Sequence, residues 1–340
     1  MVILSKLKFF DSTLRDGSHA VKQNLTEIGI VKYCQAIDEA RMHTVIVGHG
    51  NGLGASSIQM GRCPMDEMQM LKIAKKSLIH TKLGAFLTIG FGTIQNHVVP
   101  ALELGVDVFC LACHCTEADT MRKYIEYISR KGKEVYGVLM MYHRATPEVL
   151  LEEAKKIEGY GADGIILMDS AGASTMEMVK KTISLLTSNL NIEVGFHAHN
   201  NLGMAVANTY VAIKEGATLV DGTTRGFGSG AGNCQLEALL ALLEKNNIST
   251  DIDFFKVLDA SEDVVKKVWN YDKNVDATCI ISGYAGVVST FRTKVDTMAQ
   301  EYHVDPKDIF IELGRRKAIA GQDDMILEVA QYISNGKYRR

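Results

Sequence analysis

Two histidines, His197 and His199, alternate along a short run that ends in His-Ala-His-Asn-Asn. In a β-strand, the two-residue period would point both imidazoles to the same side. Two imidazoles on one face suit a divalent metal, although two hydrogen-bonded histidines without a metal would have the same spacing. Asp16, which follows an earlier predicted strand, could supply an anionic oxygen. We therefore predict a divalent metal held by Asp16, His197 and His199, with positions open for water and a chelating substrate.

A cation and a possible base flank Asp16 in the sequence Arg-Asp-Gly-Ser-His. A buried arginine is costly unless it pairs with an anion, and a guanidinium binds a planar carboxylate through two parallel hydrogen bonds. Arg15 therefore predicts a substrate carboxylate, with an internal salt bridge as the alternative. His19 is close enough in sequence to act as a general base near neutral pH, and the alternative is a supporting or surface histidine.

A metal, an arginine for a carboxylate and a histidine base together predict enolate chemistry on a 2-keto acid. The metal would chelate the keto and carboxylate oxygens of the substrate. It would also stabilise the negative charge that develops on oxygen as the enolate forms. Mn²⁺ is the ion we expect, with Mg²⁺ or Co²⁺ as alternatives.

These residues need a scaffold that brings distant segments together, and the chain alternates short β-branched runs with amphipathic helical stretches. This alternation indicates a parallel sheet with right-handed crossovers. Eight units fit a closed (β/α)8 TIM barrel of about 250 residues, with an open doubly wound sheet as the alternative. In a barrel, the candidate residues would meet at the C-terminal ends of the strands. The strands are predicted at Lys8–Leu14, Thr44–His49, Leu83–Ile89, Val106–Cys113, Val135–His143, Gly164–Asp169, Glu193–His199 and Thr218–Thr224.

The helices between the strands carry their own start and stop signals. Ser174 with Glu177 predicts a capping box, and Gly105, Gly161 and Gly216 predict left-handed residues that end helices. We expect helices at Thr26–Ala40, Met65–His80, Glu117–Lys131, Pro147–Tyr160 and Ser174–Thr187.

The strand pattern stops after about Asn247, and the remaining chain has only helical spacing. Helices are predicted at Asp253–Asn270, Gly286–Glu301 and Gln322–Ser334. We therefore predict a catalytic barrel in residues 1–250 and a C-terminal helical domain in residues 251–340, which could dock a partner.

Composition narrows the class of protein. Hydrophobic residues make up 46% of the 340 residues and charged residues 23%, which is typical of a folded globular chain. A net charge of −3 gives no broad basic surface for nucleic acid. No run approaches the roughly 20 apolar residues of a membrane span. Seven cysteines without a secreted-domain pattern favour a reducing cytoplasm.

Two further motifs have simpler interpretations than a second site. Cys113 and Cys115 flank His114, but no second cysteine pair completes a zinc site, so buried thiols are favoured. The glycine series from Gly226 to Gly232 follows strand eight, where barrels often bind phosphate. A tight loop that allows close backbone approach is favoured there.

Several motifs resemble a known family. The segments around Asp16 and His197 resemble the metallolyase barrels that include hydroxymethylglutaryl-CoA lyase, isopropylmalate synthase and the transferase domain of pyruvate carboxylase. The closer resemblance, over nearly the whole chain, is to the 4-hydroxy-2-oxovalerate aldolase family. It is carried by Thr13–Ala20, Gly48–Gly54, His114–Asp119, Gly230–Asn233, Gly283–Gly286 and Gly321–Met325.

The resemblance implies a class II pyruvate aldolase, which cleaves 4-hydroxy-2-oxo acids such as 4-hydroxy-2-oxopentanoate to pyruvate and an aldehyde. It implies that Asp16, His197 and His199 bind the metal and that Arg15 steadies the enolate. His19 would move the proton of the 4-hydroxyl group, and Ser170 would line the pyruvate site beside Arg15 and His199. The resemblance also implies a role in aromatic hydrocarbon catabolism and an acylating acetaldehyde dehydrogenase as partner, docked on the helical end. A homo-oligomer is possible.

Two positions depart from the family pattern. The family has a glutamate that holds the catalytic arginine where this chain has Ile46, so Arg15 would need another support. The family has an active-site tyrosine where this chain has Val288. Tyr284 lies four residues earlier and would share a face with Val288 if the segment were helical. The loss of that hydroxyl would alter stereochemistry, enlarge the aldehyde pocket or reduce activity.

Three functions therefore compete. The first is the pyruvate aldolase. The second is an acyl-CoA condensing enzyme or lyase of the same superfamily, which would need room and basic groups for CoA. The third is a barrel without catalysis that serves as a binding subunit, a hypothesis motivated by Ile46 and Val288. The joint presence of Arg15, Asp16 and His19 with the histidine pair favours the aldolase.

Overall fold

The computed structural model describes residues 7–271 and 275–336, and its first part is an eight-stranded barrel. All neighbouring strands are parallel, and β8 pairs with β1, so the sheet closes in sequence order. The predicted TIM barrel is therefore confirmed. The strands are β1 (Lys8–Asp11), β2 (Thr44–Ile46), β3 (Lys82–Thr88), β4 (Val108–His114), β5 (Glu134–Met140), β6 (Gly164–Asp169), β7 (Glu193–Ala198) and β8 (Leu219–Gly222).

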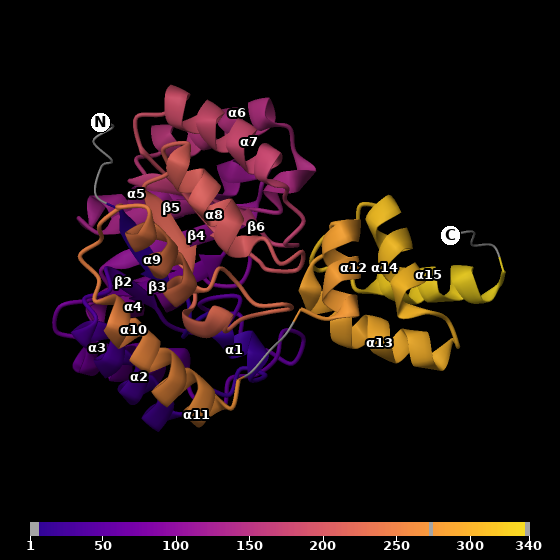
Figure 1. Cartoon of the computed structure of the whole chain (residues 1–340), viewed down its shortest axis with the longest axis horizontal. Coiled ribbons are helices and arrows are strands. Elements are labelled where there is room, and N and C mark those ends of the chain that lie inside the picture. The colour runs from indigo at the N-terminus through magenta and orange to yellow at the C-terminus, as the bar shows by residue number, and fades with distance from the viewer. Residues whose placement is uncertain (1–6, 272–274, 337–340) are drawn as a thin grey trace.

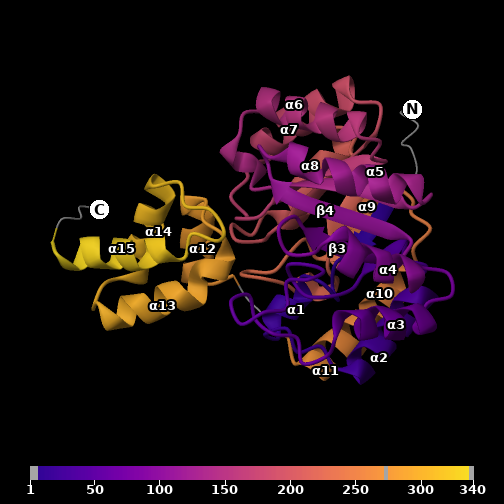
Figure 2. The same cartoon turned by 180° about the vertical axis from the view of Figure 1, so that it is seen from behind.

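Helices surround the barrel, as Figures 1 and 2 show. Gly105, Gly161 and Gly216 have φ of 86°, 93° and 97°, which confirms their predicted left-handed conformation. The helices of this layer are α2 (Glu27–Glu39), α3 (Glu67–Ser77), α4 (Val99–Glu103), α5 (Arg122–Arg130), α6 (Pro147–Gly159), α7 (Met176–Asn189), α8 (Ala205–Lys214) and α9 (Leu236–Lys245), and a short α1 (Gly17–Ala20) follows β1.

The predicted capping box at Ser174 is wrong by one residue. Thr175 is the N-cap of α7, and its side chain accepts a hydrogen bond from the amide of Met178. Ser174 is buried instead, and its amide donates to Asp169 Oδ2 at 3.1 Å. The end of β6 therefore holds Ser174 out of the capping position.

Alternate residues of each strand enter two different cores. Phe10, Ile46 and Phe86 belong to the cluster that fills the barrel interior. The other strand residues pack against the helices in a larger cluster. This alternation is the physical reason that polar residues at the strand ends can face inward, since residues two apart share a face.

The segment after α9 returns to the barrel. It comprises α10 (Phe254–Ala260), a π-helical turn (Ser261–Lys266) and α11 (Lys267–Trp269), in agreement with the predicted helix. Trp269 stacks on Phe227, with ring centroids 5.3 Å apart. Val257 and Val265 join the core between the barrel and its helices. The predicted division at residue 250 stays a prediction, and the helical residues 254–269 belong to the barrel's packing.

The last four helices form a lobe beside the barrel, with α12 nearest to it in both views (Figures 1 and 2). They are α12 (Ala277–Ala285), α13 (Arg292–Glu301), α14 (Pro306–Arg315) and α15 (Asp324–Ser334). Phe291, Phe310 and Val329 belong to a separate core within this lobe. The predicted C-terminal helical region is confirmed. None of the helices described is long and apolar enough to cross a membrane.

The predicted helix from Gly286 to Glu301 is wrong in its first half. Gly286 has a φ of 66° and ends α12, because its left-handed backbone cannot continue a helix. Val288 precedes a 3-10 turn (Ser289–Phe291), and α13 begins only at Arg292. Tyr284 and Val288 therefore do not share a helical face.

Candidate metal centre and active site

The structure brings Asp16, His197 and His199 together. One ligand atom from each residue lies within 4.8 Å of the others, and all three side chains are buried. Asp16 lies in the turn after β1, His197 is in β7, and His199 directly follows β7. β7 pairs with β8 and β8 with β1, so barrel closure joins these segments.

The donor set fits a divalent metal. His197 Nε2 and His199 Nδ1 are buried and make no hydrogen bond to the described residues. Burial lowers the pKa of His199 to about 4, so its imidazole is neutral and can donate a lone pair at neutral pH. Burial alone would raise the pKa of Asp16, but Arg15 and the nearby histidines outweigh it and keep the carboxylate ionised. Buried imidazoles and a carboxylate are the ligands that a divalent ion requires.

A second carboxylate lies behind the histidine pair. Asp221 faces His197 across the β7–β8 pairing, and its Oδ1 lies 3.0 Å from His197 Nδ1. The two atoms lie at ion-pair distance without the geometry of a hydrogen bond, so Asp221 places negative charge beside the ring and leaves Nε2 for the ion. Sequence reasoning did not single out Asp221. The available signal was its position two residues after inward-facing Leu219 in strand eight.

The glycine-rich loop after β8 holds Asp16. The side-chain amide of Asn233 donates to Asp16 Oδ2, and the amide of Ser229 donates to the same oxygen at 3.4 Å. A Cβ on Gly228 would lie 2.6 Å from that oxygen and 2.5 Å from Asn233 Nδ2. The loop thus uses its glycines for close backbone approach, the interpretation that the sequence favoured. Sequence analysis named Asn233 only as part of a family motif.

Arg15 is buried beside Asp16 although position 46 is an isoleucine. Its Nη1 donates to Asp16 Oδ1 at 3.2 Å and to the carbonyl oxygen of Gly50 at 3.3 Å, and Nη2 donates to Ser12 Oγ at 3.4 Å. The guanidinium also lies 4.4 Å from the ring centroid of Phe86, a cation–π distance. Backbone, hydroxyl and aromatic contacts therefore support Arg15 where the family has a glutamate. Arg15 Nε is buried and has no acceptor among the described residues.

His19 lies at the edge of the same cluster. Its Nε2 is 3.9 Å from Asp16 Oδ1, and its Nδ1 is 3.2 Å from the side-chain nitrogen of Gln23. If that nitrogen is the donor, Nδ1 accepts and the proton of a neutral ring lies on Nε2. Gln23 also accepts from the amide of Gly50 at 3.0 Å. Burial lowers the pKa of His19, which favours the neutral base.

The remaining predicted residues occupy different places. Ser170 follows β6, is half-buried, and accepts a hydrogen bond from the amide of Met141 at 3.0 Å. Ile46 lies in the barrel interior, and Val288 is buried in the core of the C-terminal lobe. Tyr284 is 75% exposed on α12. Cys113 and Cys115 are buried, and burial raises their thiol pKa values to about 12 and about 11.

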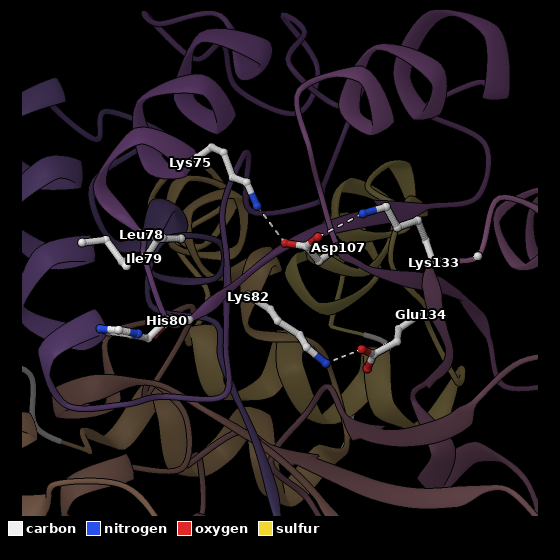
Figure 3. A pocket seen from close by; sticks show the side chains of 10 residues that line it. Lys75, Leu78, Ile79, His80, Lys82, Asp107, Lys133 and Glu134 are labelled. Carbon is white, nitrogen blue, oxygen red and sulfur yellow. Dashed lines mark hydrogen bonds and ion pairs between the residues drawn. The ribbon is translucent and has the colours of Figure 1, made fainter.

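A hollow of about 320 Å³ opens at the other end of the barrel, where β3 and β5 begin. Figure 3 shows that its charged side chains are ion-paired: Lys75 and Lys133 both contact Asp107, and Lys82 contacts Glu134. The Lys75–Asp107 and Lys133–Asp107 distances are 2.9 and 3.0 Å. Catalytic groups of such barrels gather at the C-terminal strand ends, so this hollow is a structural feature and not the active site.

Comparisons with known proteins agree with this geometry. The family described as HMGL-like matches residues 103–264, and the family described as DmpG-like communication domain matches residues 273–335. A 4-hydroxy-2-oxovalerate aldolase of Pectobacterium atrosepticum is 49% identical over 96% of this chain and 95% of its own length. One of Spirochaeta aurantia is also 49% identical, over 96% and 95%.

The chain belongs to the 4-hydroxy-2-oxovalerate aldolase family.

The predicted family and the predicted enzyme class, a carbon–carbon lyase of the aldolase type, are therefore confirmed. Membership in this family, together with the buried cluster, supports a divalent metal as cofactor. Among solved structures, the carboxyl transferase domain of Rhizobium etli pyruvate carboxylase aligns with a TM-score of 0.80 at 14% identity. That alignment covers 97% of this chain and 60% of that one. This likeness shows the shared fold.

Proposed function

We propose that this member of the aldolase family cleaves a 4-hydroxy-2-oxo acid, such as 4-hydroxy-2-oxopentanoate, to pyruvate and an aldehyde. The observation that carries the proposal is the buried cluster of Asp16, His197 and His199, with Arg15 and His19 both beside Asp16. The names of its relatives support the substrate class. An acyl-CoA reaction would need free basic groups for CoA, and the lysines around the hollow, Lys75, Lys82 and Lys133, are already paired with carboxylates.

We assign the metal site to Asp16, His197 and His199, and we propose Mn²⁺ as the ion, with Mg²⁺ or Co²⁺ as alternatives. When bound, the ion would polarise the keto group and stabilise the negative charge that develops on its oxygen. Arg15 would bind the same end of the substrate, since its free Nε–H can donate to a carboxylate or enolate oxygen. Ser170 and His199 would complete the pyruvate site.

His19 would act as the base. In the tautomer with its proton on Nδ1, the neutral ring takes the proton of the 4-hydroxyl group at Nε2, the C4 oxygen forms the aldehyde carbonyl, and the C3–C4 bond breaks. The electron pair of that bond moves into the pyruvate enolate, whose charge Arg15 helps to balance. The enolate then takes a proton at C3 and leaves as pyruvate. This tautomer requires Gln23 to turn its side-chain oxygen toward His19 Nδ1, which in the structure faces the Gln23 side-chain nitrogen.

We also propose that the C-terminal lobe docks an acylating acetaldehyde dehydrogenase, which would consume the aldehyde. The match of residues 273–335 to the communication domain supports this. Ile280 and Tyr284 on α12 are 49% and 75% exposed, so this helix offers apolar surface to a partner. A place in aromatic hydrocarbon catabolism stays a prediction.

Proton exchange tests the enolate half of the reaction without knowledge of the aldehyde. The protein is incubated with pyruvate and Mn²⁺ in D₂O, and deuteration at C3 is followed by NMR. We expect exchange with the native chain and its loss in His199→Ala, by a factor of about 10³ or more because the metal contribution is removed. His80→Ala, an exposed histidine at the opposite end of the barrel, is the matched control. Absence of exchange with Mn²⁺ demonstrably bound would contradict the proposal and favour the non-catalytic barrel.

A further inference from the structure

Asn201 joins the loop of the metal ligands to the C-terminal lobe. Its side chain is fully buried, and its amide nitrogen donates to Ser282 Oγ and Ser289 Oγ, both at 2.7 Å. The carbonyl oxygen of Cys279 lies 3.3 Å from the same nitrogen. One barrel side chain thus contacts α12 and the turn that follows it.

Glycines surround this side chain because a larger residue would not fit. A Cβ on Gly172, in the loop after β6, would lie 2.8 Å from Asn201 Oδ1, and a Cβ on Gly283 of α12 would lie 2.9 Å from Asn201 Cβ. A Cβ on Gly230, in the loop after β8, would lie 2.1 Å from Ser289 Oγ. Three loops of the barrel, α12 and the turn after α12 therefore meet around Asn201 without spare space.

The same loop carries a proposed metal ligand two residues earlier. The amide of His199 donates to the carbonyl of Asp169 at 3.4 Å, and the amide of Asn200 donates to Gly232 at 2.8 Å. His199 also forms an antiparallel bridge with Asn233, beside a hydrogen bond from the amide of Cys234 to the carbonyl of Ala198 at 2.8 Å. The loops after β6 and β8 therefore support the backbone of His199 within the barrel. The three side-chain contacts of Asn201 connect the same loop to the lobe.

We infer that Asn201 is a positioning residue through which the C-terminal lobe holds His199 in its metal-binding geometry. The inference rests on the metal site of the proposed function. Loss of the contacts between Asn201 and the two serines would release His199, so an event at the lobe that breaks these contacts changes metal affinity. By thermodynamic linkage, metal binding must stabilise the docked lobe by the same factor.

A second contact between barrel and lobe provides a matched control. Arg144, in the turn after β5, donates from Nη2 to the carbonyl of Gly286 at 2.8 Å, and the carbonyl of Ala318 lies 3.4 Å from the same nitrogen. This contact lies at the ends of α12 and α14. No proposed metal ligand lies on β5, and Arg144→Met leaves the contacts of Asn201 with Ser282 and Ser289 in place, so it should loosen the ends of α12 and α14 while His199 stays held.

The test removes the acceptors in the lobe and leaves the barrel loop unchanged. In a Ser282→Ala, Ser289→Ala double variant of the full chain, we expect Mn²⁺ binding about tenfold weaker, the low end for loss of a residue that supports a ligand. Backbone amides of residues 199–203 should exchange with solvent faster. Arg144→Met should speed exchange in the lobe but change the Mn²⁺ dissociation constant by less than twofold. Asn201→Leu, similar in size, should reproduce the double variant.

Two results would overturn the inference. The first is unchanged Mn²⁺ affinity in the double variant while amides in α12 exchange faster, since the contact would then be only structural. The second is equal protection of residues 199–203 in the double variant and in Arg144→Met. Failure of the native chain to bind Mn²⁺ would instead contradict the proposed function, and the exchange comparison would still decide the role of Asn201. Circular dichroism establishes that each variant is folded.

Discussion

At the N-terminal end of the barrel, Lys75 and Lys133 both contact Asp107, and each charge has a partner within the protein. At the C-terminal end, His197 Nε2 and His199 Nδ1 are buried without a hydrogen bond, and Arg15 Nε has no acceptor among the described residues. The two ends are built on the same strands, so the fold itself does not explain the contrast. Buried imidazole and guanidinium nitrogens without partners indicate that a ligand belongs at the C-terminal end.

The carboxylates of the two ends also differ. Burial raises the pKa of Asp11, at the end of β1, to about 6, and the hydrogen bonds from Thr13 and Tyr33 only partly oppose this. Burial would also raise the pKa of Asp107, but its hydrogen bonds and charge interactions with Lys75 and Lys133 outweigh burial and lower the pKa. The ion-paired Asp107 and the buried Asp11 should therefore change the stability of the protein differently when they are mutated or when the pH changes.

The largest effect is expected from Arg15→Lys. Lysine keeps the charge but loses the Nε–H donor and the planar stacking on Phe86. We expect kcat for aldol cleavage to fall about 10²–10³-fold, as for removal of one donor to a developing oxyanion, with little change in Mn²⁺ affinity. Arg122→Lys, an exposed arginine on α5, is the control. If the variant retains more than a tenth of the native kcat, Arg15 does not have the proposed role in catalysis.

The contribution of Asp11 to stability should depend on pH in the opposite sense to that of Asp107. Its folded pKa of about 6 exceeds its ordinary value of 3.8, so the folded state binds more protons between these values and stability falls as pH rises. The loss from this group should be about 2 kcal/mol between pH 4 and pH 7. Urea unfolding at several pH values measures the free energy of unfolding of the native chain and of Asp11→Asn. The difference between the two isolates Asp11, because groups that titrate alike in both proteins cancel.

Asp107 provides the contrast for the same measurement. Its folded pKa is lowered, so its contribution is present above the unfolded pKa and is lost as pH falls. The stability difference between the native chain and Asp107→Asn should therefore change with the opposite sign. A pH-independent difference for Asp11→Asn would mean that Asp11 does not titrate in this window.

Asp221→Asn should have a smaller effect, confined to metal binding. The amide keeps the size of the side chain but removes the negative charge beside His197 Nδ1. We expect Mn²⁺ to bind 10- to 100-fold more weakly, in the range for loss of a carboxylate that supports a histidine ligand. Activity should largely recover at saturating Mn²⁺. Native affinity in the variant, measured by Mn²⁺ titration, would show that Asp221 does not tune the site.

The smallest effect is expected from Lys82→Met at the opposite end. Its ion pair with Glu134 is partly exposed, with the lysine side chain 40% accessible, and such pairs contribute about 0–1 kcal/mol. The free energy of unfolding should change by no more than this, and kcat and Mn²⁺ affinity should stay unchanged. A clear loss of activity would show that the hollow in Figure 3 takes part in function.

The barrel could be predicted from sequence because its signals are local. Alternating strands and helices, and glycines such as Gly161 after a helix, appear within short windows. The candidate ligands were found because His197 and His199 share a strand and Asp16 ends another. Asp221 was missed because its role depends on the register between β7 and β8, which no single strand reveals.

The C-terminal lobe was harder to predict from the same signals. Gly286 stands between two helical patterns, and it was assigned to the start of a helix although it ends α12. Tyr284 and Val288 would share a face only in a continuous helix, which Gly286 interrupts, and α12 and α14 have no predicted counterpart. The contacts of Asn201 could not be predicted either, because Asn201 and Ser282 lie 81 residues apart in the sequence.

The stacked pair of Trp269 and Phe227 has a practical consequence. The chain contains a single tryptophan, and its indole lies on a ring that in turn approaches Gly17, directly after Asp16. Rearrangement of the loop after β8 around an incoming ion would change the surroundings of that indole. Intrinsic fluorescence of the unlabelled protein should therefore report on cation loading, without a dye or an engineered probe.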